Sequence, residues 1–203
     1  MFRTLFRGGA LALVGALTLT ACDSGEPDDG PGEPELITEV VVTLTNTADA
    51  SDSVTITASD SDGDGANITF SPTSVTLRPG ATYAGTIELN DTINNEEITE
   101  EIEEEAEEHL FLYAFAPASS GTITITDTES DYTSDDDNGG NFLVGLTFEA
   151  AVSGNASGTG QLRAILYHFD DDPKTSSTDT SDEIDIDIDF PVSFVSPAAI
   201  AGN

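Results

Sequence analysis

The strongest constraint on the fold of this chain is an alternation of apolar and polar residues with a period of two, which recurs from residue 35 onward. Successive side chains of a strand point to opposite faces of a sheet, and the Thr, Val and Ile residues that dominate here favour such half-buried surfaces. Pro, Gly, Asn and Asp residues between the segments supply turns. The pattern predicts an all-β fold over residues 35–195, an immunoglobulin-like or Greek-key β-sandwich of about ten strands. The alternating segments are 40–45, 53–57, 68–70, 74–77, 83–89, 110–115, 121–126, 142–148, 160–169 and 184–194.

One segment, at about 96–108, has a helical period instead. Ile98, Ile102 and Ala106 recur at every fourth position and would form a narrow apolar stripe along a helix. Nine of the thirteen residues are Glu and none is basic, so glutamates four positions apart repel one another. We therefore expect a single acidic helix, inserted in mid-chain, that depends on the packing of its apolar stripe.

The N-terminal residues have the composition of an export and anchoring segment. Arg3 and Arg7 precede an apolar run at 8–20, which is too short to span a bilayer and is typical of a secretory signal peptide. The Leu-Thr-Ala-Cys sequence that ends at Cys22 resembles a bacterial lipobox, which implies removal of residues 1–21 and lipidation of Cys22. The alternative is an ordinary signal peptide in which the only cysteine of the chain falls there by chance.

Two further segments are expected to lie outside the folded domain. Residues 22–34 combine Pro and Gly with acids, which predicts an extended tether, and the acidic run resembles the surface-export signal of Bacteroidota lipoproteins. Residues 196–203 are expected to form a flexible tail. The sequence thus predicts a bacterial cell-envelope protein anchored by lipid to the outer membrane, and leaves open a periplasmic or a surface-exposed face.

Acidic residues dominate the charge of the chain. There are 39 Asp and Glu residues against 5 Lys and Arg, a formal net charge of −34, which becomes −36 when Arg3 and Arg7 leave with the signal peptide. This charge excludes nucleic acid and anionic membrane surfaces as electrostatic partners. The expected partners are the membrane, through the lipid on Cys22, and inorganic cations. The composition is similar to that of halophilic proteins, whose self-repulsion is screened by dissolved cations.

The first candidate cation site is the D-x-D-x-D-G loop that contains Asp60, Asp62 and Asp64. Carboxylates at alternate positions of a tight turn can converge on Ca²⁺, the one cofactor that the sequence indicates. The twelfth position of a complete calcium loop carries a bidentate Glu, and here it is Ser71. The alternative is therefore an Asp-Gly turn in a protein rich in Asp.

The two histidines are the second candidate site. His109 follows the predicted helix and His168 ends a predicted strand, each with acids nearby, a combination that can bind a transition metal. No HxH or HExxH spacing supports the site, so packed or hydrogen-bonded histidines are the alternative.

The last predicted strand alternates Ile with Asp. Its alternation predicts one apolar face and one carboxylate face, the latter either solvated or in contact with a layer of cations. The apolar face would carry Ile184, Ile186 and Ile188, and the opposite face Asp185, Asp187 and Asp189.

Four segments of the sequence resemble a family of Bacteroidota lipoproteins that has no established activity. They are 62–65, 82–89, the glutamate-rich 97–109 that ends in His109, and 158–168. The family often carries the label "type 1 periplasmic binding fold superfamily", which implies a two-lobed α/β solute binder. This chain departs from that label, because it offers one helix and many strands without βαβ alternation. It also departs where Asp residues at 170–172 stand before the Pro and Lys that soon follow the second histidine in the family.

These observations predict a lipid-anchored cell-envelope module with a binding or structural role, associated with cations and without enzymatic activity. The sequence contains no G-x-S-x-G elbow, phosphate loop or dinucleotide fingerprint. One alternative is a solute-binding lipoprotein that serves a transporter, and a deep pocket would support it. A carboxylate-based hydrolase is the third possibility, because acids are abundant throughout the chain.

The excess charge generates a prediction about salt. Raising NaCl from about 0.1 M to 1 M shortens the Debye length from ~10 Å to ~3 Å and screens the repulsion among the acids. We expect the melting temperature of the purified protein to rise across this range. CaCl₂ at equal ionic strength separates screening from divalent binding, and a melting temperature that stays flat or falls in NaCl would contradict the prediction.

Overall fold

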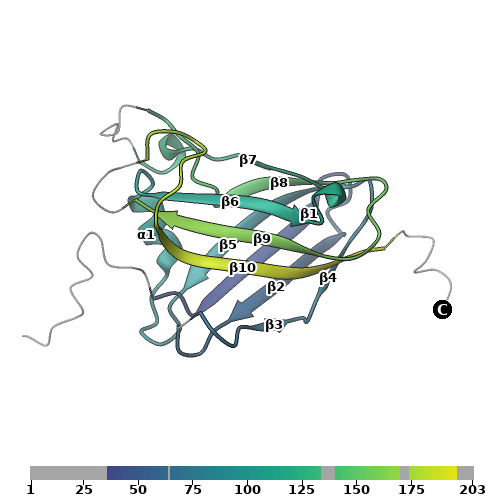
Figure 1. Ribbon diagram of the computed structural model, residues 1–203, viewed down its shortest axis with the longest axis horizontal. Helices are drawn as coiled ribbons and strands as arrows, with labels where there is room; N and C mark the ends of the chain where they lie inside the picture. The colour runs from purple at the N-terminus through teal and green to yellow at the C-terminus, as the bar shows by residue number, and fades with distance from the viewer. Residues whose placement is uncertain (1–35, 64, 134–139, 170–173, 196–203) are drawn as a thin grey trace, which may run out of the picture.

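The computed structural model describes residues 36–63, 65–133, 140–169 and 174–195; the predicted signal peptide, Cys22, the tether and the tail lie outside these ranges. Ten strands form two sheets that enclose a common core (Figure 1). The prediction of an all-β sandwich is confirmed. The strands are β1 Glu39–Asn46, β2 Ser53–Ser59, β3 Thr69–Ser71, β4 Val75–Leu77, β5 Thr82–Asn90, β6 His109–Ala116, β7 Gly121–Ile125, β8 Thr147–Val152, β9 Gly158–His168 and β10 Glu183–Phe194.

The strands divide six to four between the sheets. The larger sheet has the order β3-β2-β1-β5-β8-β7, and the smaller has the order β4-β10-β9-β6. Neighbouring strands are antiparallel, except that β4 runs parallel to the end of β10. In Figure 1, β6, β9 and β10 lie across the strands of the larger sheet. Two short 3-10 helices, Ala118–Ser120 and Glu129–Asp131, lie in the connections on either side of β7.

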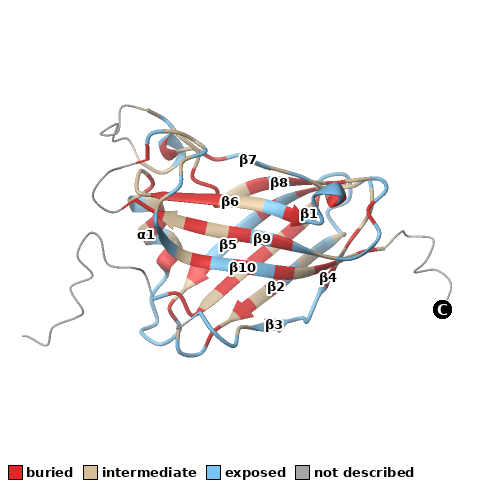
Figure 2. Cartoon of the chain, in the orientation of Figure 1, coloured by how far each residue is buried: buried red, intermediate tan, exposed pale blue. Residues whose placement is uncertain are grey.

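The period-two pattern places the core between the sheets. In β1, Val40, Val42 and Leu44 are at most 2% exposed, whereas the residues between them are half-buried. The same alternation of buried and more exposed residues runs along the other long strands (Figure 2). Burying these side chains supplies the main favourable free energy of folding.

Threonine dominates the outer face of the larger sheet. Thr55, Thr43, Thr86 and Thr147 stand opposite one another across β2, β1, β5 and β8. The Oγ1 atoms of Thr43 and Thr55 are 3.0 Å apart, and those of Thr126 and Thr147 are 2.8 Å apart. Such cross-strand hydroxyl pairs contribute to sheet stability and give the abundant threonines of the sequence a structural role.

The acidic helix forms, but it is shorter than the predicted 96–108. Helix α1 spans Ile98–Glu104, and turns lead from Glu105 to β6. No side chain caps the helix start and no basic residue lies in its last turn, so the helix itself supplies no positive charge to the negative end of its dipole. The predicted apolar stripe is correct, because Ile98, Ile102 and Ala106 are all at most 2% exposed.

The predicted two-faced pattern of the last strand is wrong at its beginning. The register of β10 against β9 shifts between Ile184 and Ile186, so one extra residue bulges from the ladder. As a result Ile184 is 48% exposed, and the side chain of Asp185 is only 1% exposed. From Ile186 onward the predicted alternation holds, with Asp187 and Asp189 exposed.

Candidate functional site

The two histidines of the chain are neighbours in space. His109 is the first residue of β6, His168 is the last residue of β9, and the antiparallel register pairs them directly. Both are buried, and their imidazole rings stack with centroids 4.5 Å apart. The site lies at the end of the sandwich next to α1 (Figure 1).

Asp185 on the adjacent strand β10 completes the group. Its Oδ1 lies 3.6 Å from Nδ1 of His168, and its Oδ2 lies 3.9 Å from Nε2 of His109. Neither carboxylate oxygen has a hydrogen-bond partner within the residues that the structure describes. We call His109, His168 and Asp185 the histidine–aspartate cluster. The bulge creates it, because an unbulged β10 would turn Asp185 toward solvent.

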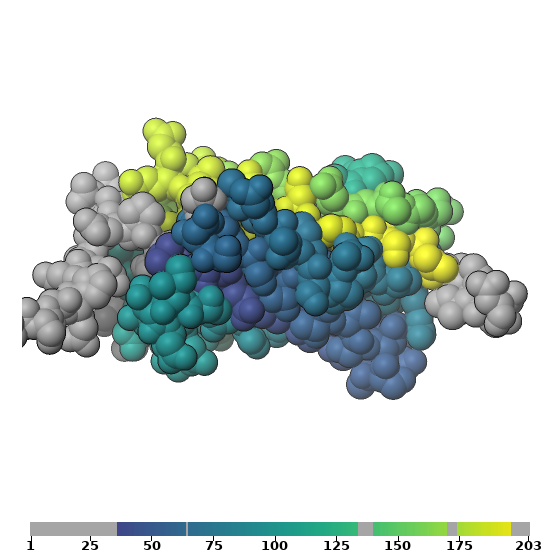
Figure 3. All heavy atoms as spheres, turned by 90° about the horizontal axis from the view of Figure 1, so that it is seen from below, coloured from purple at the N-terminus to yellow at the C-terminus, as the bar shows by residue number. Residues whose placement is uncertain are grey.

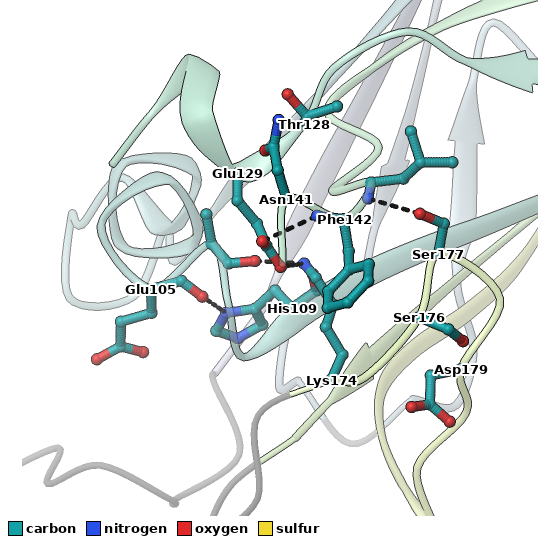
Figure 4. Close-up of polar contacts among 12 residues, drawn as sticks. Glu105, His109, Thr128, Glu129, Asn141, Phe142, Lys174, Ser176, Ser177 and Asp179 are labelled. Atoms are coloured by element: carbon teal, nitrogen blue, oxygen red, sulfur yellow. Dashed lines mark hydrogen bonds and ion pairs between the residues drawn. The ribbon is translucent and has the colours of Figure 1, made fainter. Parts of the chain in front are cut away.

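The tautomer of His109 follows from its one hydrogen bond. Its Nδ1 lies 3.1 Å from the backbone carbonyl oxygen of Glu105, which can only accept, so Nδ1 carries the proton (Figure 4). Burial lowers the pKa of His109 to about 4, the neighbouring His168 adds to this effect, and Asp185 opposes it. Neutral His109 therefore presents an unprotonated Nε2 toward the Asp185 carboxylate. The lone pair of Nε2 and the Asp185 carboxylate therefore face each other, and a cation between them would be stabilised by both.

The two donor distances from Asp185 approach those of a metal centre, although the three side chains whose donor atoms all lie within 4.8 Å of one another are Glu105, His109 and His168. Zn²⁺ binds imidazole nitrogen and carboxylate oxygen at about 2.0–2.2 Å, so two such ligands at a tetrahedral angle lie about 3.4 Å apart. The two distances from Asp185 exceed this value by a few tenths of an ångström. Two nitrogens and one carboxylate suit Zn²⁺ and similar transition metals better than Ca²⁺, which prefers oxygen alone.

Glu105 is the nearest further candidate ligand. One of its carboxylate oxygens and one nitrogen of each histidine lie within 4.8 Å of one another, the only such group of three or more in the described part of the chain. Figure 4 shows the Glu105 side chain pointing away from the imidazole, while its backbone carbonyl holds Nδ1. Glu105 thus orients His109 in the way that outer hydrogen bonds orient metal-binding histidines.

Lys174 fixes the backbone beside the cluster. It is the only lysine of the chain and is fully buried. Its ammonium donates to the backbone carbonyls of Ala106 and His109, the latter at 2.6 Å, and lies 3.2 Å from Oε1 of Glu129 (Figure 4). The other oxygen of Glu129 accepts the N–H of Phe142 at 2.9 Å. Burial lowers the pKa of Lys174 to about 8, while Glu129 favours its charged form.

The predicted calcium loop is only partly described. Asp64 lies outside the described residues, Asp62 is exposed, and Asp60 is buried with its Oδ2 2.7 Å from the N–H of Gly65. Asp60 therefore stabilises its own turn, as Asp does in an Asp-Gly loop. Among the residues with described positions, Asp60 and Asp62 belong to no group of three candidate ligands. Calcium binding at this loop stays a prediction.

Sequence reasoning identified the two histidines but did not place them together, and it missed Asp185, Lys174 and Glu129. The separation of the strands in the sequence hides their pairing, and nothing in the Ile–Asp alternation marks the bulge. The one available signal was the single lysine in a chain with 39 acids, because such a residue is a natural partner for a buried carboxylate.

Comparison with known proteins adds no relative: no family model matches the chain, and neither a curated protein nor a solved structure matches it. The resemblance to Bacteroidota lipoproteins therefore stays a prediction.

The contacts of Lys174 generate a prediction about stability. Lys174→Met leaves the buried Glu129 carboxylate without its cation, which we expect to lower the free energy of unfolding in urea by about 3–5 kcal/mol. The matched control is Arg163→Met, because Arg163 pairs with Asp187 at the surface, and we expect little change. Adding Glu129→Gln to Lys174→Met should restore part of the loss. If Lys174→Met and Arg163→Met lowered the free energy of unfolding equally, the buried Lys174–Glu129 pair would contribute no more to stability than a surface ion pair.

Proposed function

We propose that this protein is a lipid-anchored module of the bacterial cell envelope that binds a divalent transition-metal ion at the histidine–aspartate cluster. The observation that carries the proposal is the Asp185 carboxylate, which is buried and makes no hydrogen bond within the described residues while two imidazoles face it. An unpaired carboxylate in such a place costs several kcal/mol or more, and a bound cation offsets that cost.

A metal ion fits the distances better than a direct hydrogen bond does. Hydrogen bonds between imidazole nitrogen and carboxylate oxygen span about 2.7–3.2 Å, and both contacts of Asp185 are longer. The proton on Nδ1 of His109 is held by Glu105, so Nε2 has no proton to donate unless the ring is charged. A metal ion would instead accept electron pairs from all three side chains.

The enclosure of the cluster supports a binding or structural role. All three side chains are at most 2% exposed, and a closed site is typical of metals that hold a fold together. A bound ion would join β6, β9 and β10 at the end of the sandwich. The cavity beside the cluster has a volume of about 90 Å³, small beside the 300–1,000 Å³ of typical organic-ligand pockets, which gives the solute-binding alternative less support.

The location is proposed from the N-terminal sequence. The positive start, the short apolar run and the Leu-Thr-Ala-Cys sequence ending at Cys22 support export and lipid anchoring. Over the described ranges, the structure contains no helix that is long and apolar enough to cross a membrane. In this proposal the lipid on Cys22, inferred from the N-terminal sequence, is the anchor.

Calorimetric titration with Zn²⁺ or Co²⁺ tests the metal centre. The wild-type protein should bind one equivalent, with a rise in melting temperature that a chelator reverses. Asp185→Asn, His109→Ala and His168→Ala should each weaken binding by about 100-fold or more, because even outer contacts of metal ligands are worth 10–100-fold.

The matched control is Asp189→Asn, which removes the same charge from an exposed position of the same strand and should leave affinity unchanged. Ca²⁺ should not compete, because imidazole is a poor ligand for it. Equal affinities of Asp185→Asn and wild type, or no binding by wild type, would reject the centre and favour a histidine–aspartate pair joined by protons.

Cys22→Ser tests the anchor. In a bacterial host the wild-type protein should incorporate labelled palmitate and sediment with membranes, whereas Cys22→Ser should do neither, because the acceptor thiol is gone. A wild-type protein without label would refute the anchoring.

A further inference from the structure

Most of strand β10 is paired on one side only. Strand β9 runs along its whole length, whereas β4 covers only Val192–Phe194 on the other side. From Ile184 to Phe190 that second side makes no backbone hydrogen bond within the described part of the chain. Alternate residues of such an edge point their N–H and C=O groups away from the sheet, where a further strand can pair with them. We call Ile184–Phe190 the open stretch of β10.

A cavity of about 90 Å³ lies beside the open stretch. Ile186 and Ile188 line it from β10, and Val40 and Ala58 line it from the larger sheet. Ile68, which precedes β3, adds another apolar side chain. The cavity is partly open to solvent, and Figure 3 shows β10 (yellow) meeting the segment from β2 to β4 (blue) on this face of the molecule.

Exposed apolar side chains adjoin the same cavity. Among the described residues three large apolar side chains are exposed, and two of them, Leu36 and Ile184, lie here. Leu36 lies against Gly63 of the cavity wall, where an added Cβ atom would overlap its side chain. Ile184 begins the open stretch and directly precedes Asp185, another wall residue. Apolar side chains gathered beside unpaired backbone indicate a surface that a partner covers.

The charges on the solvent side of the open stretch are negative. Glu183 and Asp189 are exposed, and neither forms an ion pair with a lysine or arginine among the residues with described positions. Asp187 pairs with Arg163 on the same face. A segment that complements this edge therefore carries basic side chains on its outward face.

We infer that the open stretch of β10 is a docking site for an extended, basic segment of another protein, which adds to the smaller sheet as a strand. The inference does not depend on a metal at the histidine–aspartate cluster. Backbone hydrogen bonds supply affinity in this mode of binding, and alternate side chains supply specificity. Lys or Arg would stand beside Asp189 on the outer face, while Val or Ile would enter the cavity beside Ile186 and Ile188.

The cavity has the size that this mode of binding needs. One water molecule requires about 10–15 Å³ by the same kind of measure, so a cavity of about 90 Å³ accepts roughly one or two aliphatic side chains. Two other occupants fit the edge less well. Residues 23–35 of this chain contain six acids and three prolines and no basic or β-branched residue, so they match neither the charge nor the ladder. A second copy would bring acids to an acidic edge, since the chain has a net charge of −34.

Fluorescence anisotropy with a labelled synthetic peptide tests the docking site. The probe is an end-capped nonapeptide in which Lys and Val alternate, and the full-length protein should bind it at low salt. Two further peptides carry N-methyl groups on the backbone nitrogens of either the Lys or the Val residues, which blocks one edge and keeps every side chain. One of the two should bind about 10-fold more weakly or worse, because its hydrogen bonds to β10 are lost.

Asp189→Lys tests the position of the site on the protein. Reversing this exposed charge should weaken binding of the Lys–Val peptide by about 3-fold or more. The matched control is Glu149→Lys, which makes the same charge change at an exposed position of β8, between β5 and β7, and should bind as wild type does. In the wild type, bound peptide should slow hydrogen exchange at the backbone amides of the open stretch. Melting curves confirm that both variants are folded.

Equal binding of the unmodified peptide and both N-methylated peptides would show attraction by net charge alone and would overturn the docking site. Equal losses in Asp189→Lys and Glu149→Lys, or no binding at about 1 mM peptide, would do the same. Binding that appears only after removal of residues 23–35 would assign the edge to the chain's own N-terminal segment. A dimer that the peptide dissociates would assign it to a second copy. Either result would overturn the inferred partner.

Discussion

The antiparallel register of β6, β9 and β10 is the constraint on which the candidate site depends. It pairs His109 with His168 directly and brings the start of β10 alongside them. The single extra residue in β10 then reverses the direction of one side chain, so that a carboxylate enters the interior where the strand pattern alone would place an isoleucine. A shift of one residue in either pairing would send a member of the cluster to the solvent face. The geometry of the site is therefore determined by the pairing of these three strands.

The buried polar groups beside the cluster are held together by a single buried ammonium group, that of Lys174. The turn after α1, the first residue of β6 and the 3-10 helix at Glu129–Asp131 meet there, and the ammonium group of Lys174 binds to all three. A buried ion pair of this kind adds little net stability relative to apolar packing, but it strongly disfavours arrangements in which one partner is left alone. It can therefore specify which loop conformations accompany the correct strand register. The cost of the glutamate-rich helix is met in a similar way, by burial of Ile98 and Ile102 rather than by favourable charge.

The sequence was sufficient to predict the class of fold and insufficient to assemble the site. Alternation of Thr with Val and Ile predicts strands because it reflects burial on one face, a property that each segment carries locally. The stripe of Ile98, Ile102 and Ala106 predicts a helix for the same reason, but it does not determine where the helix begins and ends, and the helix is shorter than predicted. The meeting of His109, His168 and Asp185 depends on pairing between distant segments and on a bulge that no local pattern encodes. Asp185 was therefore assigned to the wrong face, and the partners of Lys174 were not foreseen.

The partly unpaired stretch of β10 has a consequence for how molecules of this protein behave when many lie close together. Open strand edges readily join the edges of other sheets, which leads to aggregation. Here the open edge carries Glu183, Asp187 and Asp189 at exposed positions, and Pro191, which cannot donate a backbone hydrogen bond, closes the stretch. A second copy that approached this edge in strand-to-strand fashion would meet the exposed charges of Glu183 and Asp189, whereas Asp187 is paired with Arg163. The exposed acids and Pro191 thus disfavour edge-to-edge pairing of two copies at this stretch.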